Sequence, residues 1–139
     1  MGALFLLSAL ALVAVAACGG DGNGGEESEG GKKMIAGVEA NDHGEKDVSG
    51  ETGKVDIELD DDYFEPTVLK GTPGQKVTLE LKNEGNAEHN ITIKDQNVDQ
   101  DVEPADEAEV EVTFPQSGEL SFVCKYHESA GMAGALVVS

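Results

Sequence analysis

The sequence predicts an all-β domain, a sandwich of about seven or eight short strands. Apolar and polar residues alternate with a period of two in several segments, which is typical of strands with one buried face. Clusters of Gly, Pro, Asn and Ser separate these segments, as expected for turns between strands. No segment shows convincing helical periodicity. Because Trp is absent and only 4% of the residues are aromatic, Val, Ile and Leu are expected to form most of the core.

Strands are expected at residues 55–59, 63–70, 77–81, 89–93, 110–114, 120–125 and 135–138. The first of these shows the pattern most clearly, since Val55, Ile57 and Leu59 alternate with acidic residues. Pro66 lacks a backbone N–H and therefore restricts its segment to a sheet edge or a bulge. The polar, acidic stretch 95–107 is expected to be an excursion on the surface.

The N-terminus has the composition of an export segment. Residues 3–17 are apolar apart from Ser8. A membrane-spanning helix needs about 20 apolar residues, so this run fits the core of a signal peptide better. The residues Val-Ala-Ala-Cys that end at Cys18 resemble the lipobox of bacterial and archaeal lipoproteins, which implies cleavage before Cys18 and acylation of its thiol. No Lys or Arg precedes the apolar run, so a plain transmembrane anchor remains the alternative.

These features divide the chain into a signal peptide (1–17), a flexible acidic, Gly-rich linker (18–53) and a β domain (54–139). Gly-rich acidic segments bury too little apolar surface to offset the entropy of ordering. The short apolar stretch 34–40 has the composition to dock on the domain. His43 and Met34 are left out of any site, because a lone His or Met in an acidic segment is usually solvated. Either reading of the N-terminus places the domain at the outer face of the cytoplasmic membrane.

The chain is strongly acidic, with 28 Asp and Glu against nine Lys, no Arg and a formal net charge of −19. Such a surface repels nucleic acid, so no nucleic-acid partner is expected. It attracts partners with basic docking surfaces, at rates that fall as the salt concentration rises. Solubility alone is an equally good explanation of the charge.

Four residues have side chains that suit a mononuclear copper site: His89, Cys124, His127 and Met132. The last three form the pattern Cys-x-x-His-x-x-x-x-Met. Soft sulfur suits Cu(I), imidazole suits both oxidation states, and two His with one Cys and a weak axial Met is the blue-copper arrangement. A structural zinc site is disfavoured because Met is not one of the usual zinc ligands. Since all four ligands come from the protein, no strong position is left for a substrate, and we do not expect an enzyme.

Residues 54–139 resemble the small cupredoxins of the plastocyanin, pseudoazurin and halocyanin type. The resemblance is carried by the Cys124 motif and by His89 followed by Asn90. It implies a Greek-key β-sandwich that holds one copper ion and cycles between Cu(I) and Cu(II). It also implies that the backbone beside His89, at Asn90, hydrogen-bonds the Cys124 thiolate. The exposed imidazole edge of His127 would lie in an apolar patch for partner docking formed by Ala130, Met132 and Ala133.

The function expected from these features is that of a monomeric, membrane-tethered carrier of single electrons. Its partners would be a cytochrome, an oxidase or a reductase with a basic docking surface. A copper storage or delivery module is the alternative, although the sequence lacks the Met-rich and His-rich runs usual for delivery. A third possibility is the electron-entry domain of a larger complex.

Overall fold

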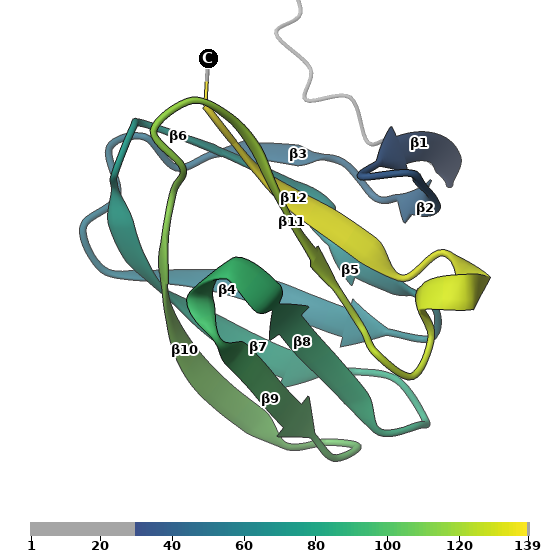
Figure 1. Ribbon diagram of the computed structural model, residues 1–139. Helices are drawn as coiled ribbons and strands as arrows, with labels where there is room; N and C mark the ends of the chain where they lie inside the picture. Colours follow the sequence, from purple (N-terminus) through teal and green to yellow (C-terminus); the bar gives the residue numbers. More distant parts are fainter. Residues whose placement is uncertain (1–29, 139) are drawn as a thin grey trace, which may run out of the picture.

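The computed structural model describes residues 30–138, which form a β-sandwich (Figure 1). One sheet has four strands in the order β10-β7-β4-β5, and the other has six in the order β3-β6-β12-β11-β8-β9. A separate two-stranded hairpin, β1-β2, lies beside them. The strands are β1 (Gly31–Ile35), β2 (Val38–Asp42), β3 (Glu45–Asp47), β4 (Lys54–Asp60), β5 (Tyr63–Glu65), β6 (Val68–Gly71), β7 (Lys76–Asn83), β8 (His89–Ile93), β9 (Val98–Val102), β10 (Glu107–Thr113), β11 (Gly118–Val123) and β12 (Ala133–Val138). The predicted all-β sandwich is confirmed.

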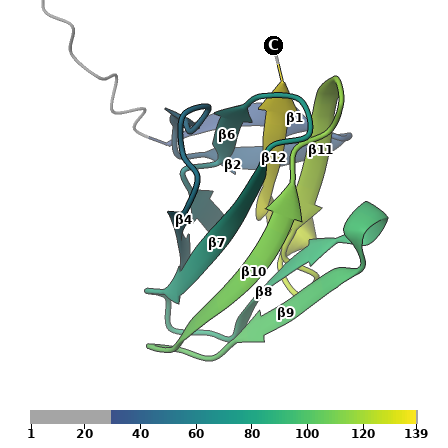
Figure 2. The ribbon, with the colours of Figure 1, turned by 90° about the vertical axis from the view of Figure 1, so that its left-hand side faces the viewer.

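The four-stranded sheet follows the alternation in the sequence. In β4 the side chains of Val55, Ile57 and Leu59 are buried, while the residues between them are exposed. Strand β7 alternates in the same way, and it pairs with β4 in parallel and with β10 antiparallel, so the three lie side by side (Figure 2). The period of two thus places one face of each strand in the core.

The core between the sheets is aliphatic, as expected, with three Phe side chains added. Phe64, Phe114 and Phe122 are among its largest fully buried side chains. Phe64 and Phe122 meet edge to face, with ring centroids 5.0 Å apart. Such a pair joins the four-stranded sheet, through β5, to the six-stranded sheet, through β11.

The predicted linker ends too late in the sequence, because residues 31–53 are part of the folded domain. They contain β1, β2 and β3, and β3 pairs with β6 in parallel. Ile35 and Ala40 are fully buried in a second apolar cluster with Val68, Ala133 and Ala135. This burial, which needs partners from β6 and β12, orders a segment whose own composition is polar and Gly-rich. Residues 1–29, with the predicted signal peptide and Cys18, lie outside the described residues.

The acidic stretch 95–107 was also predicted wrongly as a surface excursion, since it contains strand β9. This strand pairs antiparallel with β8 and forms the edge of the six-stranded sheet. Its residues alternate between exposed and partly buried, and Val102 at its end is buried in the main core. Backbone pairing with β8 defines this strand, and only Val98 and Val102 at its ends pack against the core. Pro66 separates β5 from β6, so the extended segment 63–70 contributes a strand to each sheet.

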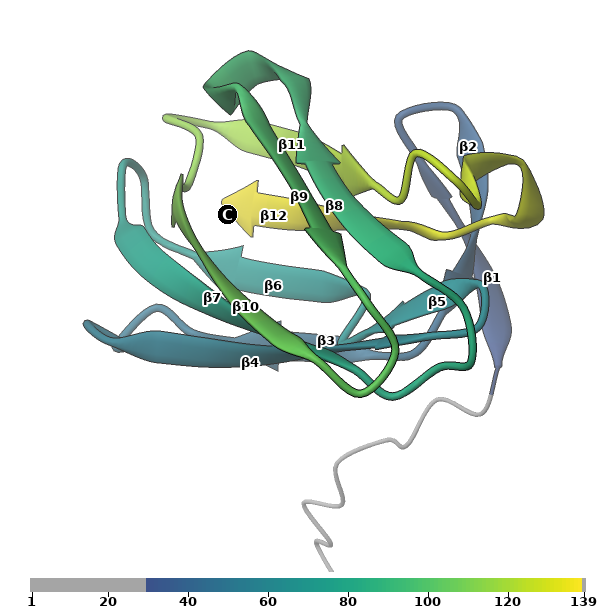
Figure 3. The same ribbon diagram turned by 90° about the horizontal axis from the view of Figure 1, so that it is seen from below.

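The helical elements in residues 30–138 are the short 3₁₀ turns η1 (Lys94–Gln96) and η2 (Glu128–Ala130). No helix in this part of the chain is both long and apolar enough to cross a membrane. Turn η2 belongs to residues 124–132, which connect β11 to β12 and are called the ligand loop below. Figure 3 shows this loop, in yellow, beside the β1-β2 hairpin.

Candidate metal centre

Sheet pairing brings the predicted ligands to one end of the sandwich. His89 is the first residue of β8, and Cys124 directly follows the last residue of β11. The two strands are antiparallel neighbours, and Val123 pairs with Thr92. The start of β8 and the end of β11 therefore lie at the same end of the six-stranded sheet, which places His89 beside the ligand loop.

Three of the four predicted ligands converge. The ligand atoms of His89, Cys124 and His127 all lie within 4.8 Å of one another. The Cys124 Sγ is 3.5 Å from His127 Nδ1, and the centroids of the two imidazole rings are 4.9 Å apart. Two nitrogens and one sulfur at this separation have the chemistry and the spacing for a single metal ion.

Met132 is fully buried in the same apolar cluster as Cys124. Its backbone closes the ligand loop, because its N–H donates to the His127 carbonyl at 3.1 Å and its carbonyl accepts from the Cys124 N–H at 3.0 Å. Gly131, just before it, has a φ of +97°, a conformation that glycine adopts without strain. The loop therefore turns inward at Met132 and holds it at the same end of the molecule as the other three residues.

His89 is buried and lacks polar partners. Neither of its ring nitrogens has a hydrogen-bond partner among residues 30–138, although Nε2 lies 3.5 Å from Asp61 Oδ1. Burial, aided by the neighbouring His127, lowers the pKa of His89 against the opposing effect of Asp61, which favours the neutral ring. Buried polar atoms without partners are rare and call for an explanation. A neutral imidazole that binds a metal ion is such an explanation.

Cys124 has the environment of a metal-binding thiol. Burial raises the pKa of this thiol, and hydrogen bonding from the backbone of Tyr126, Asn90 and His127 opposes that rise. The Asn90 contact agrees with the role that the resemblance implies for its backbone. Metal binding requires the thiolate, so a bound ion would displace the proton. With His89 and His127 this sulfur forms a donor set that fits, and can bind, one copper ion.

The side chain of Asn90 has a structural role that the sequence did not reveal. Its Nδ2 donates to the carboxylates of Asp99 and Asp101, each at 2.8 Å. Its Oδ1 accepts from the Thr92 hydroxyl at 2.6 Å. The amide thus fixes the start of β8 to the edge strand β9, and with it the position of the neighbouring His89.

The predicted docking patch needs a correction. Ala130 is exposed and His127 is partly exposed, as predicted. Ala133 and Met132 are fully buried, and Ala133 packs in the second apolar cluster with Ile35 and Ala40. The β1-β2 hairpin, which lies in the predicted linker segment, covers Ala133. This residue therefore cannot contact a partner.

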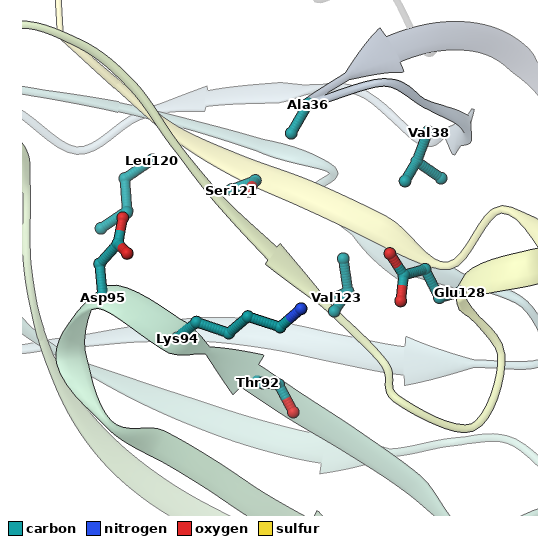
Figure 4. Close-up of a pocket in the computed structure, with 9 residues that line it drawn as sticks. All are labelled: Ala36, Val38, Thr92, Lys94, Asp95, Leu120, Ser121, Val123 and Glu128. Carbon is teal, nitrogen blue, oxygen red and sulfur yellow. The ribbon is translucent and has the colours of Figure 1, made fainter.

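A pocket lies close to the metal centre but apart from its ligands (Figure 4). It has a volume of about 220 Å³ and is lined by Ala36, Val38, Thr92, Lys94, Asp95, Leu120, Ser121, Val123 and Glu128. The Lys94 side chain extends across it towards Val123 and Glu128. Glu128 is the lining residue that belongs to the ligand loop, so the hairpin and this loop form neighbouring walls.

The family profile described as Cupredoxin-like domain matches residues 34–138. The chain belongs to the cupredoxin-like family. No curated protein sequence matches this cupredoxin. Membership of the family supports copper binding and electron transfer in general, and the fold serves mostly electron carriers rather than enzymes.

Solved structures share the fold at low sequence identity. The metal-binding domain of the Cu(I)-exporting P-type ATPase CopA of Streptococcus pneumoniae D39 is 16% identical, with a TM-score of 0.55 over 68% of this chain and 95% of that one. Auracyanin B is 18% identical, with a TM-score of 0.54 over 63% and 89% of the two chains. Reduced auracyanin of Roseiflexus castenholzii is 19% identical, with a TM-score of 0.50 over 64% and 98%.

Proposed function

We propose that this cupredoxin is a type 1 copper protein that carries single electrons between redox proteins at the outer face of the cytoplasmic membrane. The observation that supports this most directly is the convergence of His89, Cys124 and His127 at a buried position. These three residues, with Met132 as the fourth ligand, would hold one copper ion. Bound there, copper would supply reversible one-electron chemistry between Cu(I) and Cu(II).

The protein would hold one ligand arrangement and keep water away from it. His89, Cys124 and Met132 are fully buried. His127 is partly exposed, so its imidazole would provide the route between the buried site and a docked partner. The start of β8 and the end of β11 support two of the ligands on paired strands, which suits a site that must not rearrange.

The location proposed for this protein depends on Cys18, the candidate lipidation site. The order of the described strands is compatible with an anchor at that residue. Strand β1 begins at Gly31, and Lys32 pairs with Asn41, whose N–H donates to Gly131 of the ligand loop. Residues 19–30 can span roughly 40 Å when fully extended. An anchor at Cys18 would therefore keep the copper site within reach of proteins in the same membrane.

The proposed partners are cytochromes, oxidases or reductases with basic docking surfaces. This protein would bind them as a monomer. Acidic side chains surround the exposed Tyr126 close to Cys124. The Tyr126 hydroxyl lies 3.0 Å from Asp101 Oδ1 and 3.3 Å from Glu88 Oε1, and its one hydrogen is shared between these two carboxylates. Lys125 is paired with Asp99 and Asp101, so its positive charge is already compensated. This surface would attract a basic partner to the end of the molecule that carries His127.

A visible spectrum of the full chain during titration with Cu(II) tests this proposal. We expect an intense thiolate-to-copper band that saturates at one copper per chain and is bleached by ascorbate. The band should disappear in Cys124→Ala and persist in Cys18→Ala, the matched control for the other cysteine. A colourless complex, or a band that survives in Cys124→Ala, would exclude the blue-copper site.

Copper storage or delivery is a second candidate, favoured by the similarity in fold to a copper exporter's metal-binding domain solved with Cu(I). The two functions differ in how firmly copper is held. A delivery module should release Cu(I) quickly to a competing chelator, and a carrier should retain it through repeated oxidation and reduction. Chelator competition combined with voltammetry of the same sample separates them.

A further inference from the structure

We infer that the β1-β2 hairpin is a clamp on the ligand loop and that Asn41 is the positioning residue of this clamp. The inference rests on the proposed function, since it assigns the ligand loop to copper. Asn41 lies on β2, within the predicted linker segment. Its importance comes from contacts with residues far away in the sequence.

Asn41 makes three hydrogen bonds to two loops. Its Nδ2 donates to the carbonyl of Ala130 at 3.0 Å and to the carbonyl of Asp62 at 2.7 Å. Its backbone N–H donates to the carbonyl of Gly131 at 2.9 Å. The side-chain oxygen accepts from the Lys32 ammonium group, which holds the amide in this orientation. Both amide hydrogens and the amide oxygen are therefore in use.

The two loops that Asn41 joins both lie beside the proposed metal ligands. Ala130 and Gly131 directly precede Met132 and follow His127 within the ligand loop. Asp62 follows Asp61, whose carboxylate lies 3.5 Å from His89 Nε2. One amide thus connects the segment between two proposed ligands to the turn beside a third.

The hairpin also packs tightly on the loop. A Cβ atom at Gly131 would lie 2.8 Å from the Glu39 carbonyl oxygen and 3.0 Å from Asn41 Nδ2, so β2 could not approach a larger residue this closely. A second contact between the hairpin and this region is apolar, because Ile35 and Ala40 are buried in one cluster with Ala133. Figures 1 and 3 show the hairpin beside the yellow ligand loop. Figure 4 shows that Ala36 and Val38 of the hairpin line the same pocket as Glu128 of the ligand loop.

The clamp would keep the ligand loop in one conformation with or without copper. Most of the loop from Lys125 to Ala130 is exposed. A site for electron transfer gains from ligands held in place by a supporting shell of hydrogen bonds. Loss of the Asn41 donors should therefore loosen the loop, and it should change the copper environment without removing a ligand.

Two variants of Asn41 distinguish the loss of its side-chain hydrogen-bond donors from the loss of the side chain itself. Asn41→Asp keeps the size and the Lys32 contact, but its carboxylate cannot donate to Ala130 or Asp62. Asn41→Ala removes the side chain. The matched control is Gln75→Ala, because Gln75 Nε2 also donates to two carbonyls, those of Val48 and Glu51 at 2.6 and 3.0 Å. Gln75 precedes β7, whose other end leads towards His89, so it lies far from the ligand loop.

The first measurement is amide hydrogen exchange in the copper-free full chain. We expect the Gly131 and Met132 amides to exchange about tenfold faster in both Asn41 variants, as the loss of one or two hydrogen bonds allows. In Gln75→Ala they should exchange at the native rate. The second measurement is the visible and electron paramagnetic resonance spectrum of the copper-loaded chain, which should change in the Asn41 variants and stay native in the control.

Native exchange in Asn41→Asp, or an equal acceleration in Gln75→Ala, would overturn the clamp. If Asn41→Ala does not fold, the exchange rates of Asn41→Asp alone test the clamp. The exchange experiment needs no copper, so its result stands even if the titration with Cu(II) shows no blue site. Failure of the proposed function and failure of the clamp are therefore distinguishable.

Discussion

A Cβ atom at Gly85 would lie 2.6 Å from Nε2 of His89, closer than real Cβ contacts. It would also lie 2.7 Å from Asp61 Oδ1. The turn before β8 accommodates the imidazole and the carboxylate together because residue 85 has no side chain. Asn83 supports this turn, since its Oδ1 accepts from the Gly85 N–H at 2.9 Å.

Gly85→Ala should therefore displace His89 and weaken copper binding. We expect at least a tenfold loss of affinity, and a decrease of about 1–3 kcal/mol in the free energy of unfolding, as is usual for overpacked positions. Competition titration and urea unfolding measure the two effects. Gly53→Ala is the control, because a Cβ there would meet no described atom within 4 Å. Similar changes in both variants would contradict the steric explanation.

His89→Leu should abolish the blue colour and yet stabilise the copper-free protein. The native ring leaves two buried nitrogens without hydrogen bonds among the described residues. Replacing such a group with an apolar one of similar size should raise the free energy of unfolding by about 1–2 kcal/mol. Urea unfolding of both copper-free proteins checks this. A less stable variant would show that the contact with Asp61 stabilises the folded ring.

The folded protein should lose stability at high pH through Tyr63. Its hydroxyl donates to Asp60 Oδ2 at 2.8 Å, and this hydrogen bond, with burial, raises the pKa of Tyr63 from 10.0 to about 12. A raised pKa means that folding favours the neutral phenol. The contribution is therefore complete below pH 10 and is lost as the pH rises towards 12. The difference in unfolding free energy between native protein and Tyr63→Phe, measured from pH 8 to 12, should shrink over that range; a constant difference would refute the assignment.

Electron transfer with a basic cytochrome should slow as salt is added. Glu88 accepts a hydrogen bond from the exposed Tyr126, on the surface proposed for docking. Glu88→Gln should reduce the bimolecular rate constant about twofold at low salt and have little effect above 0.3 M, where charges are screened within several ångström. Glu111→Gln on β10, in the other sheet, is the control for net charge. Stopped-flow kinetics would argue against this docking surface if the two variants slowed equally.

Local patterns predicted β4, β7 and β10 well, because each has a single buried face that the alternation of residue types displays. They failed for β9, whose polar residues reflect its position at the sheet edge and whose partner is the backbone of β8. They failed again for β1 and β2. Two buried side chains, Ile35 and Ala40, anchor that hairpin, and their partners come from β6 and β12.

The sequence by itself determined the donor set of the site, since the spacing of Cys124, His127 and Met132 is local and the chemistry of these side chains is intrinsic. Only the tertiary structure decided that His89 meets them, because the pairing of β8 with β11, through Thr92 and Val123, brings together segments that are distant in the sequence. It also decided that Ala133 is buried and that Asn41 spans two loops. Alternation reports which side of a strand is buried but not which strand lies beside it, and hydrogen bonds between distant segments leave no periodic signal.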